Sequence, residues 1–146
     1  MIYKNPPKKF SPRFEIVSCY VEHDGKILLL RRHGDKSEGN RWGVPAGKMD
    51  KGEDKLDAMI REIREETGQK ISPSQLKYLT KVYVKYPEYH FVYHMFRTKL
   101  NERPQVEISA KEHKEYRWAS PHDALKWNLV RELDRCIKMF YESKNQ

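Results

Sequence analysis

Four glutamates and one arginine recur at fixed steps in the middle of this 146-residue chain. They are Glu53, Arg61, Glu62, Glu65 and Glu66. Around them, apolar residues repeat at three- and four-residue intervals, which predicts an amphipathic helix over residues 52–67. At about 100° per residue, the last three glutamates fall within an arc of about 100° beside the apolar face. Like charges so arranged repel each other. The spacing therefore predicts a site for Mg²⁺ or Mn²⁺, hard cations that carboxylate oxygens bind.

The ends of this predicted helix carry residues that suit their positions. Gly52 and Glu53 suit a helix start, because an acidic residue there meets the positive end of the helix dipole. Gly68 suits the position just past the end, where a left-handed backbone conformation is needed. Ala58 lies one turn before Glu62 and leaves room on the acidic side. We therefore expect the helix to present its carboxylates as one group.

The segment Gly47–Gly68, GKMDKGEDKLDAMIREIREETG, resembles the sequence box of the Nudix hydrolases. The family pattern is a Gly, five residues, a Glu, seven residues, and then Arg-Glu-apolar-any-Glu-Glu-any-Gly-apolar. The matching residues are Gly47, Glu53, Arg61, Glu62, Ile63, Glu65, Glu66 and Gly68. Gln69 departs from the pattern, which has an aliphatic residue there, and Ile71 is expected to take over its packing. So many matches at fixed spacing indicate far more than a lone glycine motif does.

The resemblance implies a role for each matching polar residue. The implied metal ligands are Gly47, through its carbonyl, and Glu62, Glu65, Glu66 and Glu112. The resemblance makes Glu65 either a further ligand or the general base. Glu112 is similar to the acid that completes the metal shell or takes the proton in some members. Arg61, with Glu53 as its partner, is expected to act in catalysis by orienting the carboxylates, a task that suits a planar guanidinium fork.

Segments on both sides of the box carry the same resemblance. They are VSCYVEHDGKILLLRR from Val17 to Arg32, RWGVPAGK from Arg41 to Lys48, and EHKEYRWASPHDALKW from Glu112 to Trp127. The resemblance implies an α/β (α+β) fold, a Nudix-type α/β/α sandwich with a mixed β-sheet. We expect an N-terminal arm over residues 1–12 and a single Nudix hydrolase domain over residues 13–146.

Hydrophobic patterning predicts the elements that position these residues. Two strands around a turn at Asp24 and Gly25 come first, followed by a loop over residues 33–40. A hairpin around Pro87, a short strand and a short helix capped by Ser120 come later. The expected strands are Phe14–Glu22, Lys26–Arg32, Lys77–Lys85, His90–Leu100 and Glu115–Ala119. The stripe of Leu129, Leu133, Ile137 and Phe140 predicts a final helix from Asn128 to Ser143.

The chain is basic, with 29 Lys and Arg against 21 Asp and Glu and a formal net charge of +8. Such a surface attracts anions and steers a polyphosphate toward the site, although nucleic acid is the other common partner of a basic protein. Near the acidic segment, Arg31, Arg32, Arg41 and Lys48 are the candidate substrate-binding cations. Tyr86 joins them as a candidate nucleobase contact.

Other features of the sequence bear on its compartment. No run of eighteen apolar residues is present, so we expect no membrane span. No apolar run follows the N-terminal lysines, so we expect no secretory signal. Cys19 and Cys136 lie far apart in sequence, which favours a reduced, cytoplasmic compartment over a disulfide framework. His90 and His94 fall in a strand pattern with no third ligand at zinc spacing.

The expected function is Mg²⁺- or Mn²⁺-dependent hydrolysis of a pyrophosphate linkage in a nucleoside diphosphate derivative. The late segment resembles that of small nucleoside-triphosphate pyrophosphohydrolases, which favours a triphosphate cleaved to a monophosphate and pyrophosphate. A dinucleoside polyphosphate hydrolase is an alternative, because Tyr86 or Tyr83 follows the box at an offset similar to that of a tyrosine in that branch. A non-catalytic nucleotide- or RNA-binding module is another, which the complete set of box carboxylates disfavours. The expected partner is a small-molecule nucleotide, bound by a monomer or homodimer.

Overall fold

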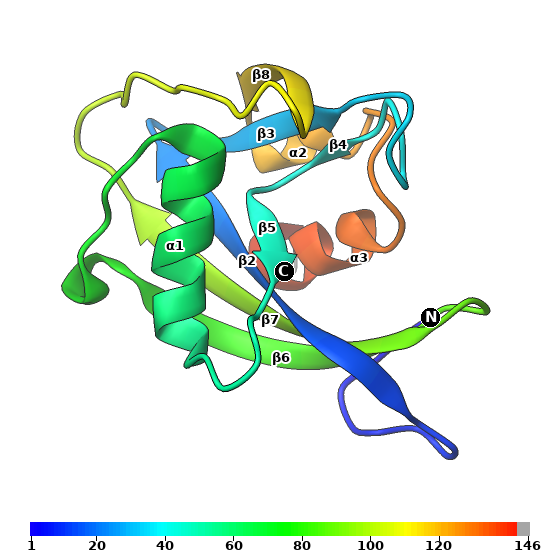
Figure 1. Ribbon diagram of the computed structural model, residues 1–146. Coiled ribbons are helices and arrows are strands. Elements are labelled where there is room, and N and C mark those ends of the chain that lie inside the picture. Colours follow the sequence, from blue (N-terminus) through cyan, green and yellow to red (C-terminus); the bar gives the residue numbers. More distant parts are fainter. Residues whose placement is uncertain (143–146) are drawn as a thin grey trace.

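The computed structural model describes residues 1–142, which form a mixed β-sheet with helices on both faces (Figure 1). The strands are β1 (Ile2–Tyr3), β2 (Pro12–His23), β3 (Lys26–Arg32), β4 (Trp42–Gly43), β5 (Ala46–Lys48), β6 (Lys77–Lys85), β7 (His90–Lys99) and β8 (His113–Ala119). The helices are α1 (Lys55–Thr67), the 3₁₀ turn η1 (Pro73–Gln75), α2 (Pro121–Ala124), α3 (Leu133–Ile137) and the π-helical turn η2 (Lys138–Glu142).

The sheet is built around the parallel pair of β2 and β7. Its strands run in the order β1-β6-β7-β2-β3-β4, while β5 pairs with β2 and β8 pairs with β3. All other pairs between these named strands are antiparallel. Within the described residues, no helix is long and apolar enough to cross a membrane.

Each face of the sheet carries its own hydrophobic core, because successive side chains of a strand point to opposite faces. One core combines α1 with alternate residues of β2 and β3; it includes Val17, Cys19, Val21, Leu28, Leu30, Met59 and Ile63. The other combines α3 with the intervening residues; it includes Tyr20, Ile27, Leu29, Cys136 and Ile137. A sheet between two helical layers is an α/β/α sandwich, so the expected fold class is confirmed (Figure 1).

Helix α1 begins later than the predicted start at residue 52. Asp54 is its N-cap, since the Asp54 carboxylate accepts a hydrogen bond of 3.0 Å from the Leu56 backbone N–H. Gly52 has a φ of 79° and belongs to the turn before the helix, so Glu53 precedes the helix instead of opening it. The predicted end is confirmed: Gly68 has a φ of 77° and its backbone N–H donates to the Arg64 carbonyl.

The predicted strands all form, although several ends differ. β3 and β6 have the predicted bounds, β7 ends one residue early, and both β2 and β8 begin two residues early. Asp24 and Gly25, at φ values of 51° and 76°, make the predicted turn between β2 and β3. Ser120 caps α2 as predicted, because its hydroxyl accepts a hydrogen bond from the Asp123 backbone N–H at 3.1 Å.

The N-terminal arm is held more firmly than its sequence suggests. Ile2 and Tyr3 form β1 at the edge of the sheet, paired with Val84 and Tyr83 of β6. The Lys85 backbone N–H also donates to the Met1 carbonyl at 2.9 Å. Residues near the start of the chain therefore extend the sheet by one short strand.

The final helix is wrong in its first part. Residues 128–132 are not helical, because Leu129 forms a parallel β-bridge with Trp42 and the backbone of Val130 bonds to Trp42 as well. Glu132 then adopts a left-handed φ of 72° before α3 starts. Of the predicted helix, Leu133–Ile137 is α-helical and Lys138–Glu142 is π-helical, while Ser143 lies outside the described residues.

Candidate active site

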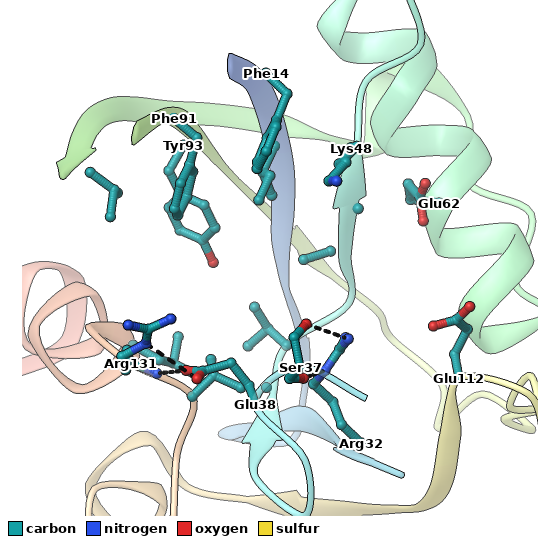
Figure 2. Close-up of a pocket in the computed structure, with 18 of the residues that line it drawn as sticks. Phe14, Arg32, Ser37, Glu38, Lys48, Glu62, Phe91, Tyr93, Glu112 and Arg131 are labelled. Atoms are coloured by element: carbon teal, nitrogen blue, oxygen red, sulfur yellow. Dashed lines mark hydrogen bonds and ion pairs between the residues drawn. The ribbon is translucent and has the colours of Figure 1, made fainter. Parts of the chain in front are cut away.

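A cleft of about 1080 Å³ lies beside β5 and α1 and extends to the segment that precedes α3 (Figure 2). One end is acidic and is lined by the box residues Arg61, Glu62, Glu65 and Glu66. The other end is lined mainly by aromatic side chains and by residues 130–133. The two ends together make an elongated site with different chemistry at each end.

Arg61 and Glu53 form a bidentate ion pair, joined by two hydrogen bonds, at the acidic end. Arg61 Nε donates to Glu53 Oε2 and Arg61 Nη2 donates to Glu53 Oε1, both at 2.9 Å. The Asp50 backbone N–H adds a third bond to Glu53 Oε1 at 2.9 Å. The Arg61 bonds, followed by this backbone bond, lower the pKa of Glu53 to about 2, and the same pairing raises the pKa of Arg61. Both side chains are therefore charged over the physiological range.

The remaining donors of Arg61 reach the two neighbouring glutamates and β5. Arg61 Nη1 lies 2.9 Å from Glu62 Oε1 and 3.3 Å from Glu65 Oε2. Arg61 Nη2 also donates to the Lys48 carbonyl at 3.1 Å. One guanidinium group thus fixes the spacing of three carboxylates and ties α1 to the strand beside it.

Glu62 and Glu66 are the two buried carboxylates of the site. Glu62 packs so closely against Gly47 that a Cβ at that glycine would lie 2.1 Å from Glu62 Cδ. Glu66 Oε1 accepts a hydrogen bond from the Ala46 backbone N–H at 3.0 Å. Burial raises the pKa of both glutamates, and well above the usual value for Glu66. Like-charge repulsion adds to this effect, because Glu65 and Glu53 raise the pKa of Glu62, and Glu62 and Glu112 raise the pKa of Glu66.

The acidic end fits a hard divalent cation by its donor chemistry. When ionised, its carboxylate oxygens accept hydrogen bonds but cannot donate them. A bound cation would offset the cost of burying the charges of Glu62 and Glu66 and the repulsion between them. No three His, Cys, Asp or Glu side chains of residues 1–142 form a complete metal cage by themselves. Mg²⁺ does not need one, because it keeps several waters and commonly takes one or two carboxylates together with substrate phosphates.

Glu112 enters the cleft from the loop before β8 and lies at the same end of the cleft as Glu62, below it in Figure 2. Its charge helps to raise the pKa of Glu66, so it belongs electrostatically to the acidic end. Lys36 lies 4.0 Å from Glu112 Oε1. Arg32 also lines the cleft, where its Nε donates to the Ser37 carbonyl at 2.7 Å.

The other candidate cations divide into two groups. Lys48 lines the cleft, with its Nζ 4.3 Å from the centre of the Phe14 ring. Arg31 and Arg41 are not among the described residues that line it. Arg31 pairs with Glu115 at 3.0 Å, and Arg41 approaches Glu38 at 3.4 Å. Arg41 therefore contacts the wall of the cleft through Glu38, whereas Glu115, the partner of Arg31, is not among the described lining residues.

The two candidate tyrosines lie in different places. Tyr86 is buried at the aromatic end of the cleft, and its hydroxyl donates to the Arg131 carbonyl at 3.1 Å. Tyr83 lies on β6, packed edge-on against Phe10 at a centroid distance of 5.3 Å. Tyr83 is not among the described residues that line the cleft.

Sequence reasoning missed most of the aromatic end. Phe14, Phe91 and Tyr93 line it, and across the cleft Arg131 pairs with Glu38 (Figure 2). The alternation of residues 91 and 93 along β7 could have placed those two on one face. No comparable pattern exists for the charged pair, because residues 38 and 131 are brought together only by the folded loops.

Comparison with known proteins adds an independent finding. A model of the NUDIX domain matches residues 12–140. CTP pyrophosphohydrolase of Escherichia coli K12 is 28% identical over 128 residues, which cover 80% of this chain and 82% of that protein. Nucleoside triphosphatase NudI of the same strain is 27% identical over 124 residues, covering 78% of this chain and 86% of that protein. Several other curated relatives match only locally, and 30% to 37% of their length is covered.

Among solved structures, the MutT protein from Methanosarcina mazei Go1 superposes with a TM-score of 0.80. The match covers 93% of this chain and 98% of that chain at 24% sequence identity. A likeness at this identity shows a shared fold, in agreement with the α/β/α sandwich described above.

Proposed function

Because this chain belongs to the Nudix hydrolase family, we propose that it cleaves nucleoside triphosphates to a nucleoside monophosphate and pyrophosphate, with Mg²⁺ or Mn²⁺ as cofactor. The observation that carries the proposal is the acidic end of the cleft. There one guanidinium group, Arg61, holds Glu53, Glu62 and Glu65 in fixed positions at the wall of an open cleft. A pyrophosphate linkage repels anionic attack, so its hydrolysis requires positive charge and an oriented water.

The proposed metal ligands are Glu62, Glu65, Glu66 and the Gly47 carbonyl, with Glu112 facing them from the loop before β8. When bound, the ion would supply positive charge to phosphate oxygens and lower the pKa of a water molecule. Glu65 or Glu112 would accept the proton of the attacking water as the anhydride P–O bond breaks. Either one is accessible enough to do so, with side chains 53% and 46% exposed respectively.

The other residues of the acidic end position these groups and the substrate. Arg61 and Glu53 orient the carboxylates without touching the phosphate chain. Lys48 and Arg32 line the cleft beside them and would neutralise phosphate charge. Arg31 and Arg41 are assigned structural roles, because they pair with Glu115 and Glu38 and are not among the described residues that line the cleft.

The choice of a triphosphate is supported by two relatives, a CTP pyrophosphohydrolase and a nucleoside triphosphatase. The dinucleoside polyphosphate alternative is suggested by Tyr86 or Tyr83. The Tyr86 hydroxyl donates to the Arg131 carbonyl, and Tyr83 lies outside the described lining of the cleft, so neither tyrosine favours it. The non-catalytic alternative is set aside, because the chain belongs to a hydrolase family and its box carboxylates line an open cleft. A cytoplasmic location is part of the proposal, supported by the two buried, unpaired cysteines.

The proposal is tested with a panel of nucleotides at fixed free Mg²⁺, with products separated by ion-exchange chromatography. We expect at least one nucleoside triphosphate to give monophosphate and pyrophosphate, and we expect excess chelator to abolish the reaction. Release of inorganic phosphate as the first product would contradict the proposed bond. Full activity in chelator would contradict the proposed cofactor.

A further inference from the structure

Arg131 lies at the aromatic end of the cleft, in the segment before α3. We propose that Arg131 selects the nucleobase, favouring cytosine and guanine over uracil and adenine. This inference rests on the proposed function, in which the triphosphate occupies the acidic end and the base therefore points toward the aromatic end.

Four contacts fix Arg131 in place. Its backbone N–H donates to Glu38 Oε1 at 2.7 Å, and its Nε donates to Glu38 Oε2 at 3.2 Å. Its guanidinium carbon lies 3.9 Å from the centre of the Tyr86 ring, and the Tyr86 hydroxyl donates to the Arg131 carbonyl. Glu38 has a left-handed φ of 57°, a costly conformation for a residue other than glycine. The guanidinium plane is therefore oriented before any ligand arrives, which is what a recognition residue requires.

The outer edge of this guanidinium group retains donors for a ligand. Nη1 bonds to both oxygens of Glu88 at 3.2 Å, but the Glu88 side chain is 57% exposed and that ion pair can be exchanged at little cost. For Nη2 no partner exists among the described residues. Nη1 and Nη2 can therefore present two parallel N–H groups.

Two parallel donors match a base edge that carries two adjacent acceptors. Guanine offers O6 and N7, the usual acceptors for an arginine that donates two parallel hydrogen bonds. Cytosine offers N3 and O2 side by side on its pairing edge. In uracil the two carbonyl oxygens are separated by an N–H donor, and in adenine N1 and N7 each flank an amino donor. Uracil and adenine would thus leave one donor unpaired, and an unpaired polar group in a binding site costs affinity.

The opposite wall binds bases without distinguishing them. Phe14 and Phe91 make this wall aromatic, with nearly parallel rings whose centroids lie 5.7 Å apart and whose planes meet at 17° (Figure 2). Stacking on such a surface tolerates every base, because each has a π face. Discrimination is therefore left to the polar edge at Arg131.

The experiment measures kcat/KM for CTP, GTP, UTP and ATP with the wild-type protein and with Arg131→Lys. For the wild type we expect kcat/KM for CTP and GTP to exceed kcat/KM for UTP and ATP by about tenfold or more. One bidentate contact to a base provides a discrimination of this size. Lysine keeps the charge but loses the fork, so in Arg131→Lys this ratio should fall toward about one. The control is Arg135→Lys on α3, since Arg135 is 57% exposed and outside the described lining of the cleft. It should keep the wild-type ratio.

Two outcomes would overturn the inference while leaving the proposed function intact. One is wild-type hydrolysis of all four triphosphates within about twofold; the other is a preference that survives in Arg131→Lys. If no triphosphate is hydrolysed with Mg²⁺, the proposed function fails and this inference fails with it. Circular dichroism tests whether Arg131→Lys is folded. If the variant is unfolded, the wild-type ratio of kcat/KM values alone decides whether the inference stands.

Discussion

Arg61 joins the loop before α1, the helix itself and β5 through a single side chain. Its fork holds Glu53 by two bonds and reaches Glu62, Glu65 and the Lys48 carbonyl with the remaining N–H groups. A lysine has the same charge but cannot span these acceptors with fixed angles. The arrangement therefore depends on the shape of the guanidinium group as well as on its charge.

We predict that Arg61→Lys lowers kcat by about 10- to 100-fold, the usual effect of losing a residue that orients metal ligands. KM should change much less, because the misplaced carboxylates weaken transition-state contacts first. Steady-state kinetics at saturating Mg²⁺ gives both constants. Arg64→Lys on the exposed side of the same helix is the matched control. A change in KM alone would mean that Arg61 binds substrate directly.

Glu66 leads to a prediction with opposite effects on activity and stability. Burial and the charge of Glu62 raise its pKa in the folded state. A raised carboxyl pKa contributes stability that is present below the unfolded value and is lost as the pH rises through the folded value. Without metal, Glu66→Gln should therefore raise Tm at pH 8. At saturating Mg²⁺ the same variant should lower activity by about two orders of magnitude or more, because a metal ligand is lost. A differential scanning calorimetry trace with chelator tests the first effect, and an unchanged turnover would refute the ligand assignment.

His113 predicts acid sensitivity of the folded protein. Burial, followed by the nearby charge of Arg32, lowers its pKa from 6.5 to about 4, and its Nδ1 has no partner among residues 1–142. A depressed folded pKa means stability that is present above pH 6.5 and is lost as the pH falls through about 4. His113→Gln should reduce this loss by about 2 kcal/mol. Urea unfolding at pH 7.5 and pH 4.5 measures it, and equal losses in both proteins would contradict the assignment.

At the scale of elements, α1 presents its carboxylates only because both of its ends are fixed. Asp54 caps the start, and Gly68 ends the helix in a left-handed conformation. Beside the helix, Gly47 lets β5 approach Glu62 more closely than any side chain would permit. The turn, the helix and the short strand therefore act as one unit.

The two glycines with positive φ at the ends of this unit allow a matched test. Gly68 and Gly52 have φ values of 77° and 79°, so alanine is strained at either position. At Gly68 the new Cβ would also lie 3.1 Å from Glu107 Cβ, whereas at Gly52 no atom lies within 4 Å. Gly68→Ala should destabilise the protein by about 1 kcal/mol or more, and more than Gly52→Ala. Thermal unfolding compares the two variants. Equal decreases in Tm would show that the contact with Glu107 adds nothing to the cost of the Gly68 substitution.

At the scale of the whole molecule, the sandwich brings together residues from almost the full length of the chain. The cleft takes Phe14 from β2, the acidic end from α1, Glu112 from the loop before β8 and Arg131 from the segment before α3. The chain as a whole carries a formal net charge of +8. The basic surface therefore attracts a polyphosphate toward a site whose own carboxylates repel it.

This charge distribution predicts a dependence on salt. Raising the ionic strength from about 0.01 M to about 0.15 M shortens the screening length from about 30 Å to about 8 Å. The value of kcat/KM for a triphosphate should fall severalfold, while kcat at saturation changes little, because steering acts on encounter. Initial rates at constant free Mg²⁺ test this. A fall in kcat alone would indicate an effect of salt on the chemical step.

The sequence by itself determined the features that depend on local spacing. The period of the apolar residues predicted α1, and the step between glutamates placed their carboxylates on one side of it. The pairing of Arg61 with Glu53 was also predicted, and the two-bonded contact at 2.9 Å confirms it. Helix and strand periods need only neighbouring residues, so one sequence is sufficient to read them.

Only the tertiary structure decided the features that depend on distant segments. The five residues before α3 belong to a helical apolar pattern, yet they are not helical. Their backbone bonds to Trp42 instead, because this long-range pairing outweighs the local helix preference. The same departure aims Arg131 at Glu38, a contact between residues 93 positions apart. Local periodicity contains no information about such a contact. The chain's spacing therefore set the acidic end of the cleft, and the packing of distant loops set the end proposed to hold the base.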